Sequence, residues 1–118
     1  MKNFKIDHRT NSGLEVLDLY GELDAHTASQ LEDSLKRLIN NQKCNIIVNF
    51  SELDYIASAG LGVFMAYIED VRDIGGDIKL TDMNDKVYNV FDLLGFPTLY
   101  DILDHEKEAV KKFLNEEG

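Results

Sequence analysis

The 118-residue sequence has no tryptophan, one proline, one cysteine and no long run of apolar residues. A lone cysteine cannot form an internal disulfide, and Cys44 stands in an apolar stretch, so we expect a small buried side chain there. A membrane-spanning helix needs about 20 consecutive apolar residues, and the polar start at Met1 is unlike a signal peptide. The sequence therefore predicts a soluble cytoplasmic protein with no membrane partner.

Positive charge is also scarce, because 12 lysine and arginine residues face 22 aspartate and glutamate residues, which gives a net charge of -10. The basic residues form no stripe, so a nucleic acid, whose phosphates repel an acidic surface, is not an expected partner. The composition, 44% hydrophobic and 29% charged, is that of an ordinary globular protein. The length fits one domain spanning residues 1–118, and we expect a monomer.

The apolar pattern predicts strands that alternate with helices. Residues 4–20 alternate apolar and polar around a turn at 11–13, as an antiparallel hairpin does, and Gly21 is expected to end its second strand. Residues 45–50 lack this alternation and predict a central strand covered on both faces. Two further strands are predicted at residues 77–81 and, more weakly, 100–103.

Apolar residues at spacings of three and four predict four helices. Asp24 or Thr27 is expected to cap the first, and Thr27 with Gln30 fits a capping box. The helices are expected to end near Asn40, Ile74, Leu94 and Asn115. The side chains expected to face the core are Ala28, Leu31, Leu35, Leu38, Ile39, Leu61, Phe64, Met65, Ile68, Val71, Ile74, Val87, Val90, Phe91, Leu94, Ala109, Val110, Phe113 and Leu114. These elements predict an α/β fold with a mixed sheet of four to five strands and helices mainly on one side.

The stretch around Ser58 joins the predicted central strand to the helix that follows it. Small residues surround this serine, namely Ala57, Ala59 and Gly60, so its hydroxyl is expected at the surface. The start of a helix also presents unpaired backbone N–H groups and the positive end of the helix dipole. Ser58 is therefore the first candidate functional residue, although serine at such a place can also serve only as a helix cap.

No strong catalytic motif is present. The histidines are not at metal-ligand spacing from one another or from the cysteine, so no metal is expected; they are His8, His26 and His105. A Ser58–His26 dyad is conceivable, but the Gly-x-Ser-x-Gly turn and a third group are missing. An esterase-like enzyme therefore stays only as an alternative, and the chain is not expected to be an enzyme.

Two other residue groups have simpler explanations than catalysis or cofactor binding. Gly60-Leu-Gly62 lacks the third glycine of a dinucleotide fingerprint, and close packing of the helix on the sheet explains both glycines better. The carboxylates of Glu22, Asp24 and Asp54 are expected in loops. In so acidic a chain, chance explains their proximity better than a role in acid–base catalysis does. No cofactor is expected.

Two sequence motifs lie on either side of the segment that holds the first predicted helix and the predicted central strand. Residues 21–27 read Gly-Glu-Leu-Asp-Ala-His-Thr, and residues 56–63 read Ile-Ala-Ser-Ala-Gly-Leu-Gly-Val. With the segments 75–80 and 90–95 after them, they resemble in type and order the motifs of the anti-sigma factor antagonists of the STAS domain family. The resemblance covers about residues 4–113 and implies a STAS-like fold and a regulator.

The resemblance implies a protein that is switched between two binding states. In the family, the serine at the position of Ser58 is phosphorylated by a partner that is both anti-sigma factor and serine kinase, and the kinase binds the ATP. The unphosphorylated form binds this partner and frees the sigma factor, and a serine phosphatase resets the cycle. The residue at the position of Asp24 belongs to a loop beside the serine.

The expected partner-binding residues follow from these motifs and from an apolar stripe on the Ser58 helix. For Val63 and Tyr67 we expect an exposed docking patch; the alternative is that they pack against the helix that starts near Asn84. The full set is Asp24, His26, Thr27, Ser58, Ala59, Gly60, Leu61, Val63 and Tyr67.

One departure from the family pattern concerns the residue before the serine. The family usually has aspartate there, and this chain has Ala57. Without the aspartate, partner binding is still expected, whereas recognition by the kinase, or the phosphorylation itself, can be lost. The alternative function is therefore a stand-alone STAS interaction module that is not switched by phosphorylation.

Overall fold

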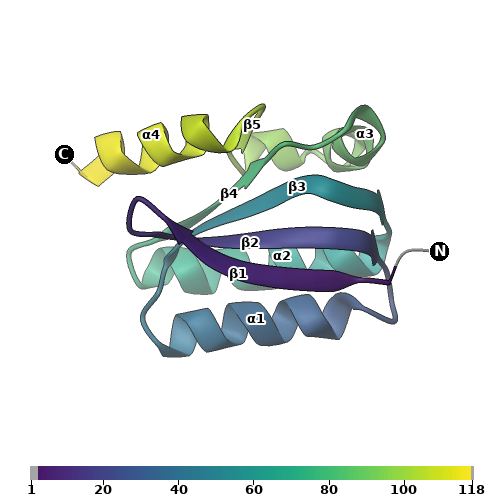
Figure 1. The fold of residues 1–118 in the computed structure, drawn as a ribbon, viewed down its shortest axis with the longest axis horizontal. Coiled ribbons are helices and arrows are strands. Elements are labelled where there is room, and N and C mark those ends of the chain that lie inside the picture. The colour runs from purple at the N-terminus through teal and green to yellow at the C-terminus, as the bar shows by residue number, and fades with distance from the viewer. Residues whose placement is uncertain (1–2, 118) are drawn as a thin grey trace.

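Five strands and four α-helices form the computed structural model, which describes residues 3–117, with side chains to residue 115 (Figure 1). In chain order the elements are β1 (Lys5–Asn11), β2 (Leu14–Leu23), α1 (Ala28–Asn40), β3 (Asn45–Ile56), α2 (Ser58–Asp73), β4 (Asp77–Thr81), α3 (Asp85–Leu93), the 3-10 helix η1 (Phe96–Thr98), β5 (Ile102–Leu103) and α4 (Glu106–Glu117). The predicted α/β class is confirmed.

The sheet has the order β1-β2-β3-β4-β5, in which β1 runs antiparallel to β2 and all other neighbours are parallel. β3 is the middle strand of this order, as its apolar run predicted. Ile46, Ile47 and Val48 are fully buried, so both faces of the strand are covered. Since β2 and β3 are parallel, their carboxyl ends meet at the same edge of the sheet.

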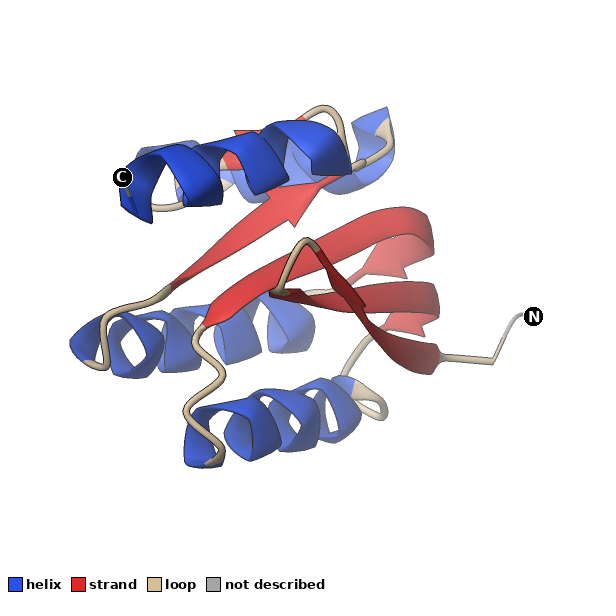
Figure 2. Cartoon of the chain, turned by 60° about the vertical axis from the view of Figure 1, so that its left-hand side comes forward, coloured by secondary structure: helices blue, strands red, loops and turns tan. Residues whose placement is uncertain are grey.

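The helices cover the two faces of the sheet unequally. α1 and α2 lie side by side on one face, and α4 lies on the opposite face (Figures 1 and 2). α3 lies near the β4–β5 edge, where Val87 and Phe91 join the same core as α1 and α2. α4 covers a smaller cluster through Ala109, Val110 and Phe113. The prediction of helices mainly on one side is confirmed.

Two strands are longer than the sequence predicted. β2 continues through Gly21 to Leu23, so the prediction that Gly21 ends the strand is wrong. A φ of 85° at Gly21 and a register shift between it and Glu22 let the strand bend without ending. β3 continues past Phe50 to Ile56, where a loop was expected. Both extensions place the Ser58 region at the tips of two paired strands.

Several side chains that were expected in the core lie at the surface. Met65, Leu94 and Leu114 expose 51%, 61% and 47% of their surface, and Ile74 is also exposed. Leu94 and Ile74 are C-cap residues, where the helical spacing no longer applies. Met65 and Leu114 each follow a buried phenylalanine, and one helical step of about 100° turns them to solvent. Cys44 is half-buried, not fully buried.

Candidate functional site

The Ser58 region lies where β2 and β3 end side by side. Leu23 pairs with Ile56 in the parallel ladder, and the backbone N–H of Ala57 donates to the Leu23 carbonyl oxygen at 2.8 Å. From these strand ends the chain continues into the Asp24–Thr27 loop and into α2. The two sequence motifs therefore form one site.

Ser58 is the first residue of α2. Ala57 occupies the N-cap position in an extended conformation (φ -110°, ψ 171°), and no side chain caps the helix. The interpretation of Ser58 as only a helix cap is therefore wrong. Its side chain is exposed, and within residues 3–117 the hydroxyl has no hydrogen-bond partner. Ser58 Oγ is thus accessible to another molecule, beside the free N–H groups of the helix start.

Gly60 and Gly62 differ in their surroundings although they are two residues apart. A Cβ atom on Gly60 would lie 2.6 Å from Leu23 Cγ and 3.1 Å from Ile56 Cγ1, both in buried side chains. Only glycine therefore lets α2 begin so close to the strands, which confirms the packing interpretation for Gly60. The same interpretation is wrong for Gly62, because this residue is exposed and has open space around it.

The Asp24–Thr27 loop is held in shape by its own polar side chains. Thr27 Oγ1 accepts from the Asp24 backbone N–H (2.9 Å) and donates to the Glu22 carbonyl oxygen (3.0 Å). Asp24 Oδ1 accepts from the His26 backbone N–H (2.9 Å). No side chain caps α1, so the predicted capping box of Thr27 and Gln30 is wrong. The His26 side chain is exposed, and the loop presents a defined shape at the site.

The predicted docking patch at Val63 and Tyr67 is not an exposed surface. Val63 exposes only 7% of its surface and belongs to the core. Tyr67 is half-buried, and its hydroxyl donates to Glu32 Oε2 on α1 at 2.9 Å. Burial, together with this carboxylate, raises the pKa of Tyr67. The exposed-patch prediction is wrong because α1 lies along this flank of α2. The helix after Asn84, which was the expected neighbour, does not cover it.

A different set of residues forms the exposed side of α2. Ser58, Gly62 and Met65 are spaced i, i+4 and i+7, which places them on one helix face, and all three are exposed. Nearby, Tyr55 at the end of β3 exposes 51% of its surface. This surface was not predicted from the sequence, although the seven-residue spacing between Ser58 and Met65 was a usable signal. We name Ser58, Gly62 and Met65 the α2 face.

Acidic residues dominate the strand ends at the site. Glu22 lies near the end of β2, Asp24 follows it, and Asp54 lies in β3 and not in a loop. The sequence has no lysine or arginine from residue 44 to residue 71, but the fold brings Lys86 of α3 close to Asp54. They share a groove of about 290 Å³ lined by Asp54, Tyr55, Ile56, Lys86, Val87, Asn89 and Val90.

Three further findings concern only the described part of the chain. Residues 3–117 contain no group of three or more His, Cys, Asp or Glu side chains arranged to hold a metal ion. The Ser58 hydroxyl forms no hydrogen bond with His26, whereas His8 Nε2 lies 2.9 Å from Glu15 Oε1. No helix in this range is long and apolar enough to cross a membrane.

Comparison with known proteins places the chain in a family. The sequence profile of the STAS domain matches residues 5–109. The chain belongs to the STAS domain family. This STAS chain is 28% identical over 109 residues to the anti-sigma F factor antagonist of Paenibacillus polymyxa. The aligned region covers 92% of this chain and 93% of the Paenibacillus protein. The chain is also 28% identical over 100 residues to the anti-sigma-B factor antagonist of Bacillus subtilis, which covers 85% and 91%.

Solved structures of the Bacillus protein SpoIIAA have the same fold as this STAS chain. Its unphosphorylated form, described as an anti-sigma factor antagonist, is 22% identical with a TM-score of 0.71 and covers 96% of this chain and 98% of that one. Its phosphorylated form is 23% identical, again with a TM-score of 0.71, and covers 94% and 99%. At this identity the likeness concerns the fold alone.

Proposed function

We propose that this STAS protein is an anti-sigma factor antagonist and that Ser58 is its switch. The unphosphorylated form binds an anti-sigma factor that is also a serine kinase, and so frees the sigma factor. Phosphorylation of Ser58 ends the binding, and a serine phosphatase restores it. The observation that carries the proposal is the exposed Ser58 hydroxyl, which has no hydrogen-bond partner among the described residues and lies beside the Asp24–Thr27 loop. The chain is a substrate here, not an enzyme, and ATP is bound by the partner.

The α2 face and the Asp24–Thr27 loop are the proposed contact surface. Gly62 and Ala59 leave room for a partner to approach the helix, and Met65 offers a flexible apolar side chain of the kind found at binding surfaces. His26, Thr27 and Tyr67 stay in the proposed contact set. Gly60, Leu61 and Val63 act beneath this surface, because they pack the start of α2 against the sheet.

A phosphate on Ser58 changes the charge of this surface more than its shape. It adds about -1.5 to -2 charges at pH 7, next to the carboxylates of Asp24 and Glu22. The N–H groups at the start of α2 can accept that charge, so the domain is expected to stay folded. In agreement with this, both forms of SpoIIAA match the fold equally well. A partner packed on the α2 face, however, would bury an uncompensated charge, which costs several kcal/mol.

The switch is tested by calorimetric titration of the cognate anti-sigma kinase with wild type, Ser58→Ala and Ser58→Asp. Ser58→Ala is expected to bind at least as tightly as unphosphorylated wild type, and Ser58→Asp to bind about tenfold or more weakly because one charge is buried. Circular dichroism should show the same fold for all three. Equal affinity of the Asp and Ala variants would contradict a role of Ser58 charge in the switch.

A second function, binding without phosphorylation, is favoured by Ala57. This residue stands where related proteins usually have aspartate, and its half-buried side chain offers a kinase no charge. Intact-mass measurement after incubation with ATP and the kinase separates the two functions. A gain of one phosphate that Ser58→Ala abolishes supports the switch. Tight binding with no gain in mass supports a STAS module that is not phosphorylated.

A further inference from the structure

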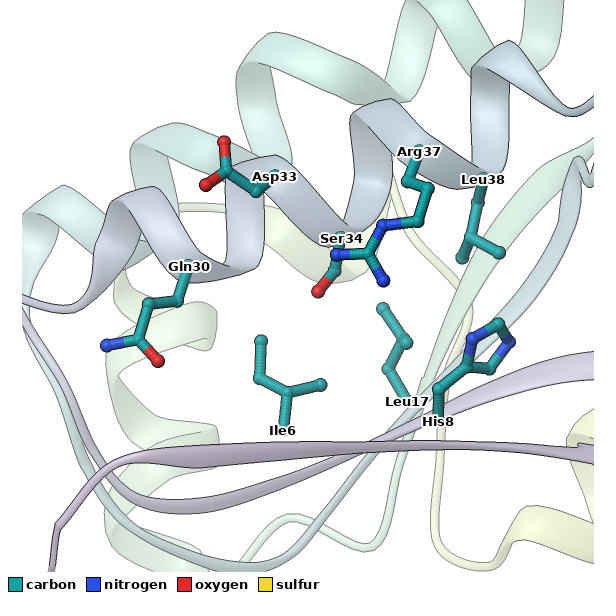
Figure 3. Close-up of a pocket in the computed structure, with 8 residues that line it drawn as sticks. All are labelled: Ile6, His8, Leu17, Gln30, Asp33, Ser34, Arg37 and Leu38. Atoms are coloured by element: carbon teal, nitrogen blue, oxygen red, sulfur yellow. The ribbon is translucent and has the colours of Figure 1, made fainter.

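A polar cleft opens between β1 and α1, on the side of α1 away from α2. Its volume is about 300 Å³, which is at the small end of the roughly 300–1,000 Å³ typical of ligand pockets. Figure 3 shows that strand residues rise into the cleft from below while helix residues reach down from α1. The lining residues are Ile6, His8, Leu17, Gln30, Asp33, Ser34, Arg37 and Leu38.

Arg37 is the unusual residue of this cleft. Arg9 pairs with Asp18 and Glu106, and Arg72 pairs with Asp77, whereas the Arg37 guanidinium has no ion pair or hydrogen bond within the described residues. This is notable in a chain with 22 acidic residues. Asp33 stands one helical turn before Arg37, yet its carboxylate points away from the guanidinium (Figure 3). Five N–H donors are thus left for a ligand.

Besides Arg37, the lining combines apolar groups, uncharged polar groups and one carboxylate, that of Asp33. Ile6 and Leu17 form its floor on β1 and β2, and Figure 3 shows the Arg37 guanidinium above Leu17, near the Ser34 hydroxyl. The amide of Gln30 lies at the other end. His8 lines the cleft near Leu38, and its Nε2 lies 2.9 Å from Glu15 Oε1. Arg37 is the one lining residue with a permanent positive charge, and its guanidinium faces the strand residues of the floor.

We propose that this cleft binds a small monocarboxylate with an apolar body. The carboxylate pairs with the Arg37 guanidinium, whose planar fork matches two carboxylate oxygens, and the apolar part lies on the exposed part of Ile6, beneath which Leu17 is buried. A single negative charge fits better than a phosphate, because Arg37 is the one permanent cation among the lining residues, Asp33 adds a carboxylate to the lining, and the chain carries a net charge of -10. The site is separate from the Ser58 region and does not depend on the proposed function.

The test is a ¹H–¹⁵N NMR titration of the full chain with acetate, hexanoate, 1-hexanol and hexyl phosphate. Hexanoate is expected to give saturable shifts at residues 6–8, 17 and 30–38, and to bind more tightly than the other three probes. Arg37→Gln should weaken hexanoate binding about tenfold, since a hydrogen bond to a charged group is lost. Lys36→Gln, one residue away on the same exposed helix, is the matched control and should change affinity less than about twofold.

Three results would overturn the assignment. Shifts that do not saturate, or that fall outside the cleft, mean that the cleft is not a site for this ligand. An equal loss of affinity in Arg37→Gln and Lys36→Gln points to diffuse charge attraction and not to a guanidinium contact. Tighter binding of hexyl phosphate rules out the preference for a monocarboxylate. Melting temperatures within a few degrees of wild type confirm that both exposed substitutions leave the fold intact.

Discussion

At the scale of single residues, the start of α2 contains both solvent-exposed and tightly packed positions. Ser58 and Gly62 face solvent, whereas Gly60 touches Leu23 and Ile56. The same helix turn therefore presents an exposed hydroxyl and packs tightly on two strand ends. Because the backbone at Gly60 lies so near the sheet, the position of the Ser58 hydroxyl depends on a residue that no partner needs to touch.

Gly60→Ala is expected to lower the free energy of unfolding by about 1–3 kcal/mol, the usual cost of overpacking a core. The added methyl group would meet Leu23 Cγ at 2.6 Å, and the buried Leu23 has little room to move. Urea unfolding followed by circular dichroism measures the change.

Gly62→Ala is the matched control for this prediction. Its methyl group enters open space in an exposed helix, so the substitution should raise the free energy of unfolding by up to about 1 kcal/mol through helix propensity. Equal destabilisation by the two substitutions would show that α2 does not approach the sheet as closely at Gly60 as the structure has it.

At the scale of elements, β3 consists of two halves with different neighbours. Residues 45–49 pair with β4, and residues 46–49 also pair with β2, so this half lies inside the sheet. Residues 52–56 pair with β2 alone. On the other edge of this second half, which carries Tyr55 and leads to Ser58, no strand pairs, and Asn84 Nδ2 donates to the Leu53 carbonyl oxygen at 3.3 Å.

Native-state hydrogen exchange should distinguish these halves. Amides of residues 46–49 are expected to exchange only through global unfolding, because partners flank them on both sides. Every second amide of residues 52–56 points away from β2 and should exchange about a hundredfold faster or more. Uniform protection along β3, or slowest exchange in the edge strand β1, would contradict this topology.

At the scale of the whole molecule, one polar network joins three strands to the last helix. Arg9 of β1 forms two hydrogen bonds with Asp18 of β2 and two with Glu106 of α4, at 2.6–2.9 Å. Glu106 also accepts from Asn11 at 2.7 Å and from Asn49 of β3 at 2.9 Å. Arg9 and these amide donors lower the pKa of Glu106 to about 2.

The stability contributed by Glu106 is expected to depend on pH. Because its pKa is lower in the folded state than the usual 4.5, the contribution is present above pH 4.5 and is lost as the pH falls toward 2. Glu106→Gln should therefore cost about 1–2 kcal/mol at pH 7, allowing for solvent screening of the partly exposed Arg9, and much less near pH 2.5. Urea midpoints at several pH values measure this difference.

Glu108→Gln removes the same charge from the same helix outside the network. It should leave the pH profile of stability close to that of wild type. If Glu106→Gln and Glu108→Gln gave the same profile, the network would contribute only through net charge.

The sequence by itself determined the order and type of the elements and the general location of the site. The alternation of apolar and polar residues predicted the hairpin, and the unbroken apolar run of residues 45–50 predicted the middle strand. The small residues around Ser58 indicated an accessible serine at a junction between strand and helix. These signals suffice because periodicity reports the burial of a residue relative to its chain neighbours. Such patterns contain no information about which other element covers a given side.

Only the tertiary structure decided which side chains at the site are accessible. Val63 and Met65 are both apolar residues of α2, but the core encloses Val63 while Met65 faces solvent. Gly60 and Gly62 look equivalent in the motif, and only the approach of Leu23 separates them. The cleft that Arg37 lines likewise forms only because β1, about thirty residues earlier in the chain, lies opposite α1. The relative position of packed elements decides these contacts, because each one joins residues that are distant in the sequence.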